Sequence, residues 1–185
     1  TVPYAELHCR SSFSFLDGAS PPEELVETAA RLGLEALAVT DRDGFYGVVR
    51  QAEAAAAIGV PSVFGAELGL VAGDPHGDPT AEADPLGRVV VLARGPEGYA
   101  ALGRAISAGQ MAGEKGAPRL TLADLAGVGG RGAAAADRWV VLTGGADGLV
   151  PSALLAEGPA AARRRLQELI ALFGAEAVRV EVWDH

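Results

Sequence analysis

The sequence predicts an α/β fold, and two observations carry that prediction. Six short apolar or β-branched runs alternate with segments of helical pattern, and the helical segments end at glycines. The runs are apolar enough to need helices on their outer faces. Such alternation implies a parallel sheet, because each crossover returns the chain to the same edge. It fits either an open doubly wound sheet or a barrel.

The predicted strands are short and rich in valine, leucine and alanine. They run over Tyr4 to Cys9, Ala36 to Thr40, Ser62 to Leu70, Arg88 to Ala93, Trp139 to Thr143 and Val178 to Trp183. The last of these runs has no helical segment after it to cover it. A bare terminal strand suggests a fragment of something longer, since exposed sheet edges are usually protected.

The first predicted helix follows the first strand in the stretch "SPPEELVETAARLG". Ser20 is its expected N-cap, Pro21 takes the first helical position, Glu23 follows three residues after the cap, and Gly33 ends it. Three further stretches read as helices in the same way: "FYGVVRQAEAAAAIG", "GPEGYAALGRAISAG" and "GPAAARRRLQELIALFG". Residues 73–87 and 127–138 are rich in Gly, Pro, Asp or Ala and are expected to be mobile surface loops.

Composition limits the class of protein. With 185 residues, 49% of them hydrophobic, the chain is expected to form a single domain over residues 1–185. It has no apolar run long enough to cross a bilayer and no signal-peptide pattern, so we expect a cytoplasmic protein with no membrane partner. The net charge of -9 argues against a general nucleic-acid-binding surface.

Charged side chains gather where the predicted strands end. In parallel strand-helix folds these ends converge on one rim, where chemistry is usually found. The residues concerned are His8, Arg10, Asp17, Asp41, Arg42, Asp43, Glu67, Asp184 and His185. Carboxylates and imidazoles bind zinc or manganese, and two or three such ions can activate water for phosphoester hydrolysis. Arginine cannot serve as a ligand because it stays protonated.

Several ordered motifs together resemble one known family. They are "YAELHCRSSFSFLDGAS", "GLEALAVTDRDGFYGVVR", "VFGAEL", "VVVLARGPEGYAALGRAIS", "GEKGAPRLTLADLAG" and "VEVWDH". This series resembles the N-terminal PHP (polymerase and histidinol phosphatase) domain of bacterial C-family DNA polymerases, most closely their error-prone, mutagenesis-associated DnaE-type branch. The resemblance implies a distorted (β/α)7-type barrel, of which this chain holds about six strand-helix units and none of the polymerase core domains.

The resemblance also implies a degenerate metal site. Family members with an intact site hold a trinuclear metal cluster, and some act as 3′ to 5′ exonucleases. The family ligand positions kept here are His8, Asp17, Glu67 and, near another ligand position, His185. Positions where the family has histidine are Arg10, Arg42 and Arg88. Asp41 and Asp43 would complete the carboxylates of the pocket.

Two functions remain open from the sequence. In the first, the domain is structural, binds no cofactor and belongs to a magnesium-dependent error-prone polymerase in DNA repair and translesion synthesis. Its partners would be the remainder of the polymerase chain, DNA through the parent protein, accessory mutagenesis proteins and the sliding clamp. The alternative is a zinc- or manganese-dependent phosphoesterase or exonuclease built from His8, Asp17, Glu67 and His185.

Smaller features carry alternatives of their own. Arg10 and Arg42 could form ion pairs with the pocket carboxylates, bind phosphate, or lie exposed in loops. The lone Cys9 is expected to be a small buried apolar residue, not a nucleophile. Phe13 and Phe15 are expected to pack their loop onto the barrel, with base stacking as the alternative.

Overall fold

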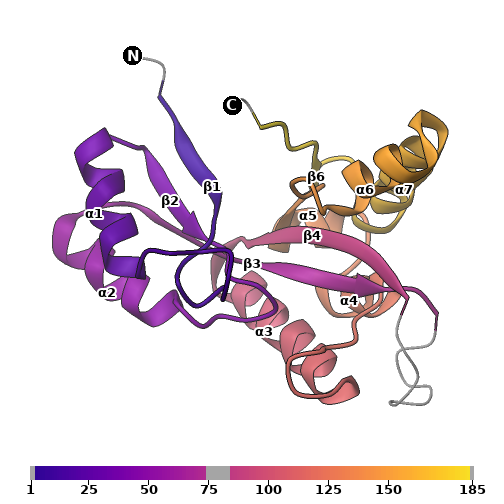
Figure 1. The fold of residues 1–185 in the computed structure, drawn as a ribbon, viewed down its shortest axis with the longest axis horizontal. Helices are drawn as coiled ribbons and strands as arrows, with labels where there is room; N and C mark the ends of the chain where they lie inside the picture. Colours follow the sequence, from indigo (N-terminus) through magenta and orange to yellow (C-terminus); the bar gives the residue numbers. More distant parts are fainter. Residues whose placement is uncertain (1–2, 74–83, 184–185) are drawn as a thin grey trace. The chain divides into compact units, whose positions relative to one another are not determined.

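The computed structural model describes residues 3–73 and 84–183 of the chain. These residues form two compact units, Thr1–Ala66 and Glu67–His185. Each unit combines strands with covering helices, so the predicted α/β class is confirmed, as are all six predicted strands (Figure 1). In the described residues, no helix is both long and apolar enough to cross a membrane.

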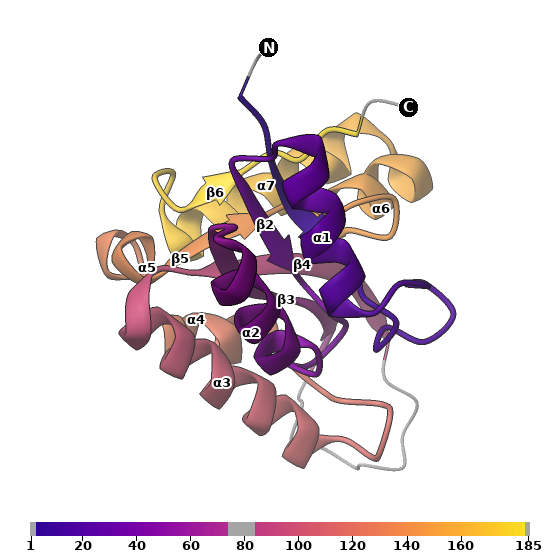
Figure 2. The same cartoon turned by 90° about the vertical axis from the view of Figure 1, so that its left-hand side faces the viewer.

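The first unit is a small parallel sheet with two helices. In chain order its elements are β1 (Ala5–Cys9), α1 (Pro22–Leu32), β2 (Ala36–Val39), α2 (Val48–Ile58) and the start of β3 (Ser62–Val71). β2 lies between β1 and β3 and pairs in parallel with both. The two helices lie against one another (Figure 2). Their inward side chains form a core with the sheet around Val26, Ala29, Leu37, Val39 and Ala55.

The start of α1 lies one residue later than the sequence indicates. Pro21, not Ser20, is the N-cap, with φ -65 and ψ 155, and Pro22 takes the first helical position. A residue that precedes a proline is held extended, so Pro21 cannot itself be helical when Pro22 follows. The predicted end is correct: Gly33 has φ 69 and its N–H bonds the carbonyls of Ala29 and Ala30.

The second unit carries four strands and five helices among its described residues. After β3 come β4 (Pro85–Ala93), α3 (Gly95–Ala112), α4 (Leu122–Gly129), α5 (Ala133–Arg138), β5 (Trp139–Leu142), α6 (Leu149–Glu157), α7 (Pro159–Phe173) and β6 (Val178–Arg179). The strand order is β3-β4-β5-β6. Trp139 and Phe173 are fully buried in this unit with their ring centroids 6.5 Å apart, and the Trp139 indole N–H donates to the Gly98 carbonyl at 2.9 Å.

The prediction of an all-parallel sheet is wrong in this unit. β5 pairs antiparallel with β4, and only β6 runs parallel to β5. Three helices, α3, α4 and α5, lie between β4 and β5. A connection this long can bring the chain back to either end of the sheet, so the alternation of strands and helices does not fix the direction of β5.

Three segments of the second unit differ from the sequence prediction. Residues 127–138 are not a surface loop: they hold the end of α4 and all of α5, and Ala135 is fully buried. The predicted helix end at Gly109 is wrong, since α3 continues to Ala112. Gly109 lies inside the helix, at a point where Leu120 packs closely against it. The last strand is only Val178–Arg179. Of the other predicted loop, residues 74–83 lie outside the described part of the chain.

Candidate functional site

Asp41 is the organising residue of the first unit. It follows β2, is 2% exposed, and accepts hydrogen bonds on both carboxylate oxygens. The Ser11 N–H donates to Oδ1 at 2.9 Å and the Ser11 hydroxyl approaches both oxygens at 2.9 and 2.8 Å. The Ser14 hydroxyl donates to Oδ1 at 2.8 Å, and the Gly47 N–H donates to Oδ2 at 3.2 Å. Four protein donors therefore solvate one buried carboxylate.

These bonds fasten two loops together. The first loop, residues 10–18, follows β1, and the second, residues 41–47, follows β2. The Arg42 N–H donates to the Ser14 hydroxyl at 3.1 Å, which joins the loops a second time. Within the first loop, the Gly18 N–H bonds the Ser14 carbonyl at 2.9 Å. The loop after β1 is thus folded around the hydroxyls of Ser11 and Ser14.

Arg42 forms the ion pair that its position predicts. One guanidinium nitrogen lies 2.5 Å from Oδ2 of Asp17, and the two side chains are 31% and 26% exposed. A charge-assisted hydrogen bond of this kind fixes geometry well. At this exposure it adds little stability, because water screens the pair and competes for both groups. The ion-pair alternative for Arg42 is therefore confirmed.

Cys9 lies at the end of β1 and is chemically quiet. Burial, followed by the nearby charges of Glu6 and Asp41, raises the pKa of its thiol to about 11. Because the thiolate is the reactive form, a thiol with this pKa is almost entirely protonated at neutral pH. This agrees with its expected role as a small apolar side chain.

The remaining sequence-predicted residues of the first unit lie around these loops. His8 is half-buried in β1, and its backbone N–H donates to the Glu6 carboxylate at 2.8 Å. Arg10 and Asp43 are half-buried in the loops, and Asp43 has a left-handed backbone with φ 54. The structure therefore brings Asp17, Asp41 and Arg42 into one bonded network, with His8 and Arg10 on the strand and loop that precede it.

The expectation that Phe13 and Phe15 pack their loop onto the barrel is wrong for Phe15. The Phe15 side chain is 83% exposed and its neighbour Leu16 is 90% exposed. Phe13 is 42% exposed and lies under the Arg50 guanidinium, whose central carbon is 5.9 Å from the ring centroid. The polar bonds of Ser11 and Ser14 to Asp41, not aromatic packing, hold this loop in place.

In the second unit, two predicted residues lie on neighbouring strands. Glu67 is fully buried in β3. Arg88 lies in β4, with its Nε 3.7 Å from Oδ2 of Asp147, and its backbone N–H donates to the Asp147 carbonyl at 3.1 Å. Sequence reasoning missed Asp147, which follows β5 in the run "GGADG". Asp184 and His185 lie outside the described residues.

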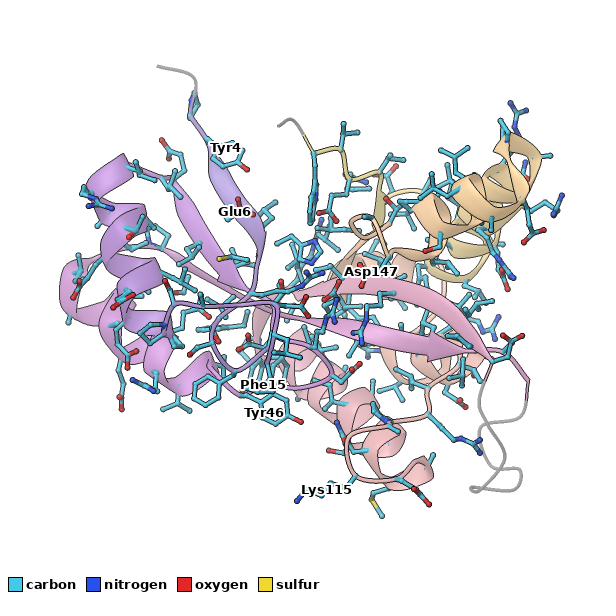
Figure 3. All side chains as sticks on the ribbon, viewed as in Figure 1. Tyr4, Glu6, Phe15, Tyr46, Lys115 and Asp147 are labelled. Atoms are coloured by element: carbon cyan, nitrogen blue, oxygen red, sulfur yellow. The ribbon has the colours of Figure 1, made fainter. Side chains whose placement is uncertain are left out.

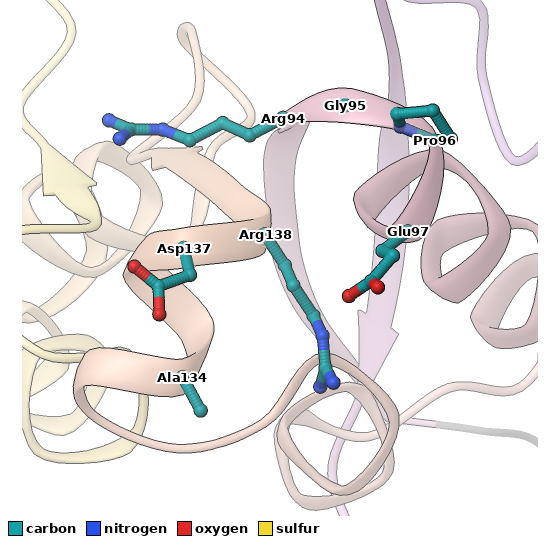
Figure 4. Close-up of a pocket in the computed structure, with 7 residues that line it drawn as sticks. All are labelled: Arg94, Gly95, Pro96, Glu97, Ala134, Asp137 and Arg138. Atoms are coloured by element: carbon teal, nitrogen blue, oxygen red, sulfur yellow. The ribbon is translucent and has the colours of Figure 1, made fainter.

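The second unit also has a surface hollow of about 330 Å³ at the start of α3 (Figure 4). Its lining includes Arg94, Glu97, Asp137 and Arg138. Figure 4 shows the Arg94 and Arg138 side chains pointing in different directions, and Arg138 donates to the Gly129 carbonyl at 3.3 Å. The two cations do not converge on one point, so this hollow is not an anion site.

Two carboxylates of the first unit are already engaged by protein groups that a metal ion would have to displace. Both oxygens of Asp41 accept hydrogen bonds from protein donors, and an oxygen of Asp17 is paired with Arg42. A metal ligand needs a free lone pair, and Arg10 and Arg42 have none to offer. Across residues 3–73 and 84–183, no three His, Cys, Asp or Glu side chains form a group that could hold an ion.

The family of the chain follows from comparison with known proteins. The model of the PHP domain family matches residues 6–185. The chain belongs to the PHP domain family. This PHP domain is 52% identical to error-prone DNA polymerases of Mycolicibacterium paratuberculosis and Mycobacterium tuberculosis, and 48% identical to that of Cutibacterium acnes.

Those relatives are much longer proteins. Each of the three matches covers 100% of this chain but 16% of the relative, so the PHP domain is homologous to one segment of a larger polymerase. Among solved structures, an amidohydrolase from Chromobacterium violaceum is 29% identical with a TM-score of 0.43, over 58% of this chain and 33% of that one.

Proposed function

We propose that this chain is a structural PHP domain of an error-prone DNA polymerase and that it does not itself catalyse a reaction. One observation carries the proposal: Arg42, where the resemblance places a metal-binding histidine, is paired with Asp17, where the resemblance places a metal ligand. Two positions of the family's metal site are thus occupied by an ion pair.

The arginine substitutions support the same role. Close carboxylates repel one another unless a cation lies between them. Arg42 supplies a fixed positive charge to Asp17, and Arg88 supplies one to Asp147. A guanidinium keeps such a network neutral without any metal, but it cannot activate water for hydrolysis.

The wider role rests on the relatives. The named relatives are error-prone DNA polymerases, and this chain matches about one sixth of their length. In such a protein the domain would brace the polymerase core, and DNA, accessory mutagenesis proteins and the sliding clamp would be partners of the whole. Nucleotide transfer, with magnesium, would take place on other segments of that polymerase.

The alternative is a zinc- or manganese-dependent phosphoesterase or exonuclease using His8, Asp17, Glu67 and His185. It requires the Asp17 carboxylate to be available to an ion. The Arg42 guanidinium 2.5 Å away makes this the less favourable arrangement, since ion binding would have to displace a charge-assisted bond.

A nuclease assay distinguishes the two functions. The wild-type chain and the double variant Arg10→His, Arg42→His are incubated with a 3′-labelled DNA single strand and manganese. We expect no cleavage above background from either protein, because within the described residues no three His, Cys, Asp or Glu side chains form a group that could hold an ion.

Cleavage that EDTA abolishes in the wild-type protein would contradict the structural role. Cleavage in the double variant alone would show that the remaining ligands were complete and that the two arginines alone silence the site. A variant carrying Asp17→Asn is the matched control, since it removes one ligand required by the enzymatic alternative.

A further inference from the structure

The two loops joined by Asp41 expose a group of large apolar side chains. They belong to the first loop, to the second loop and to the first turn of α2: Phe13 at 42% exposed, Phe15 at 83%, Leu16 at 90%, Tyr46 at 55% and Val49 at 64%. Figure 3 shows Phe15 and Tyr46 pointing outward on the same side of the first unit. Exposed apolar groups of this size commonly mark binding surfaces.

This apolar surface is held in a fixed shape. Ser11 and Ser14 are almost fully buried, and their hydroxyls hydrogen-bond the Asp41 carboxylate. These bonds fix the loop that carries the exposed Phe13, Phe15 and Leu16 side chains. Leu16 has φ 69, a left-handed conformation that a leucine rarely adopts. A loop that turns two apolar residues outward through an unfavourable backbone conformation is typical of a functional surface.

Its charge disfavours nucleic acid. Arg42 is paired with Asp17, and Arg50 is paired with Glu23, whose pKa is lowered by hydrogen bonds from its own backbone N–H and from Arg50. Residues 10–27 and 41–50 together hold six carboxylates and three arginines, and since Asp41 is buried, five carboxylates against three arginines remain for the surface. A phosphate backbone would be repelled by this balance, whereas basic side chains would be attracted.

Its size favours a short segment over a second copy of the chain. A standard interface uses roughly 20 to 30 residues on each side, and this surface offers five apolar side chains. A second copy would also bring the same excess of negative charge to the contact. An amphipathic helix needs only a few apolar anchors on one face.

We propose that Phe13, Phe15, Leu16, Tyr46 and Val49 form a docking surface for an amphipathic helix of a partner protein, with an apolar face flanked by Lys or Arg. Phe15 and Leu16, the two most exposed of these side chains, are the main anchors, and the excess of carboxylates in residues 10–27 and 41–50 attracts the basic flanks. The inference does not depend on the absence of metal chemistry, because it rests on exposure, loop anchoring and charge alone.

Synthetic peptides test this surface directly. Two labelled helical peptides of roughly 18 residues, long enough to form a stable helix, carry the same Leu and Trp face and either Lys and Arg or Glu flanks. Fluorescence anisotropy measures their binding. We expect the basic peptide to bind at least about tenfold more tightly than the acidic one, by about 1.4 kcal/mol or more.

Variants locate the contact. The double variant Phe15→Ser, Leu16→Ser should weaken binding of the basic peptide at least about tenfold. The melting temperature of the protein should be unchanged, since both side chains are exposed. Leu155→Ser is the matched control, because Leu155 is 80% exposed in the second unit and should leave binding unchanged.

Each other outcome overturns the proposal. Failure of the basic peptide to bind, equal binding of the acidic peptide, or binding that the loop variant leaves unchanged would each exclude the proposed partner. Binding of a thymidine single strand that the loop variant abolishes would assign the surface to nucleic acid. A dimer that the loop variant dissociates in sedimentation would assign it to a second copy.

Discussion

Asp41→Ala is expected to lower the free energy of unfolding by about 3 to 5 kcal/mol, a large part of a small domain's stability. The substitution leaves the buried Ser11 and Ser14 hydroxyls and the Ser11 and Gly47 N–H groups without their acceptor. Removing the acceptor from a buried donor costs the desolvation of that donor. Urea denaturation followed by circular dichroism measures the change.

The control for this substitution is Glu27→Ala. Glu27 is an exposed carboxylate on α1, so its removal should change stability by less than about 0.5 kcal/mol. If Asp41→Ala cost less than about 1 kcal/mol, the hydrogen bonds of Ser11 and Ser14 to Asp41 would not be what joins the loops, and the proposed structural role of Asp41 would be wrong.

Gly18→Ala is expected to destabilise the protein by about 2 to 3 kcal/mol through a steric clash. A Cβ at this position would lie 1.9 Å from the Ser11 carbonyl oxygen and 2.9 Å from that of Arg10. Both neighbours are backbone atoms of the loop that Asp41 holds, so they cannot turn aside as a flexible side chain could. The loop has to open to admit one methyl group.

Gly127→Ala is the matched control for that clash. Gly127 lies inside α4, and a Cβ there would meet nothing within 4 Å. Alanine is the better helix former, so this variant should be neutral or more stable by up to about 1 kcal/mol. If both variants had the same melting temperature as the wild type, the tight closure of the first loop would be disproved.

In the first unit, hydrophobic periodicity and glycine positions are sufficient to predict the secondary structure. Alternating apolar runs and glycine stops predict β1, α1, β2 and α2 to within a few residues, because these elements depend on local periodicity. The second unit was predicted less well. α4 begins with a capping box formed by Thr121 and Asp124, and the stretch "TLAD" contains its two residue types at the required spacing. The C-terminal end of α4 is rich in glycine, which in a sequence is typical of a loop.

The candidate site was predictable in its residue types but not in its bonds. The positions of Asp41, Arg42 and Asp17 indicated an ion-pair network, and Arg42 does pair with Asp17. The roles of Ser11 and Ser14 were not anticipated, although "RSSFS" places two hydroxyls directly after a strand. The hydrogen-bond donors of a buried carboxylate are set by the conformation of the surrounding loops. Hydrophobic periodicity predicts helices and strands but not loop conformations.

Metal dependence of stability tests the central claim most directly, namely that protein groups have taken the place of the metal cluster. A ligand that binds only the folded state raises its stability in proportion to the logarithm of the ligand concentration. Thermal unfolding is measured in EDTA and in increasing manganese or zinc. We predict the same melting temperature throughout. A rise of several degrees that continues with the logarithm of the metal concentration and disappears in Asp17→Asn would contradict the account.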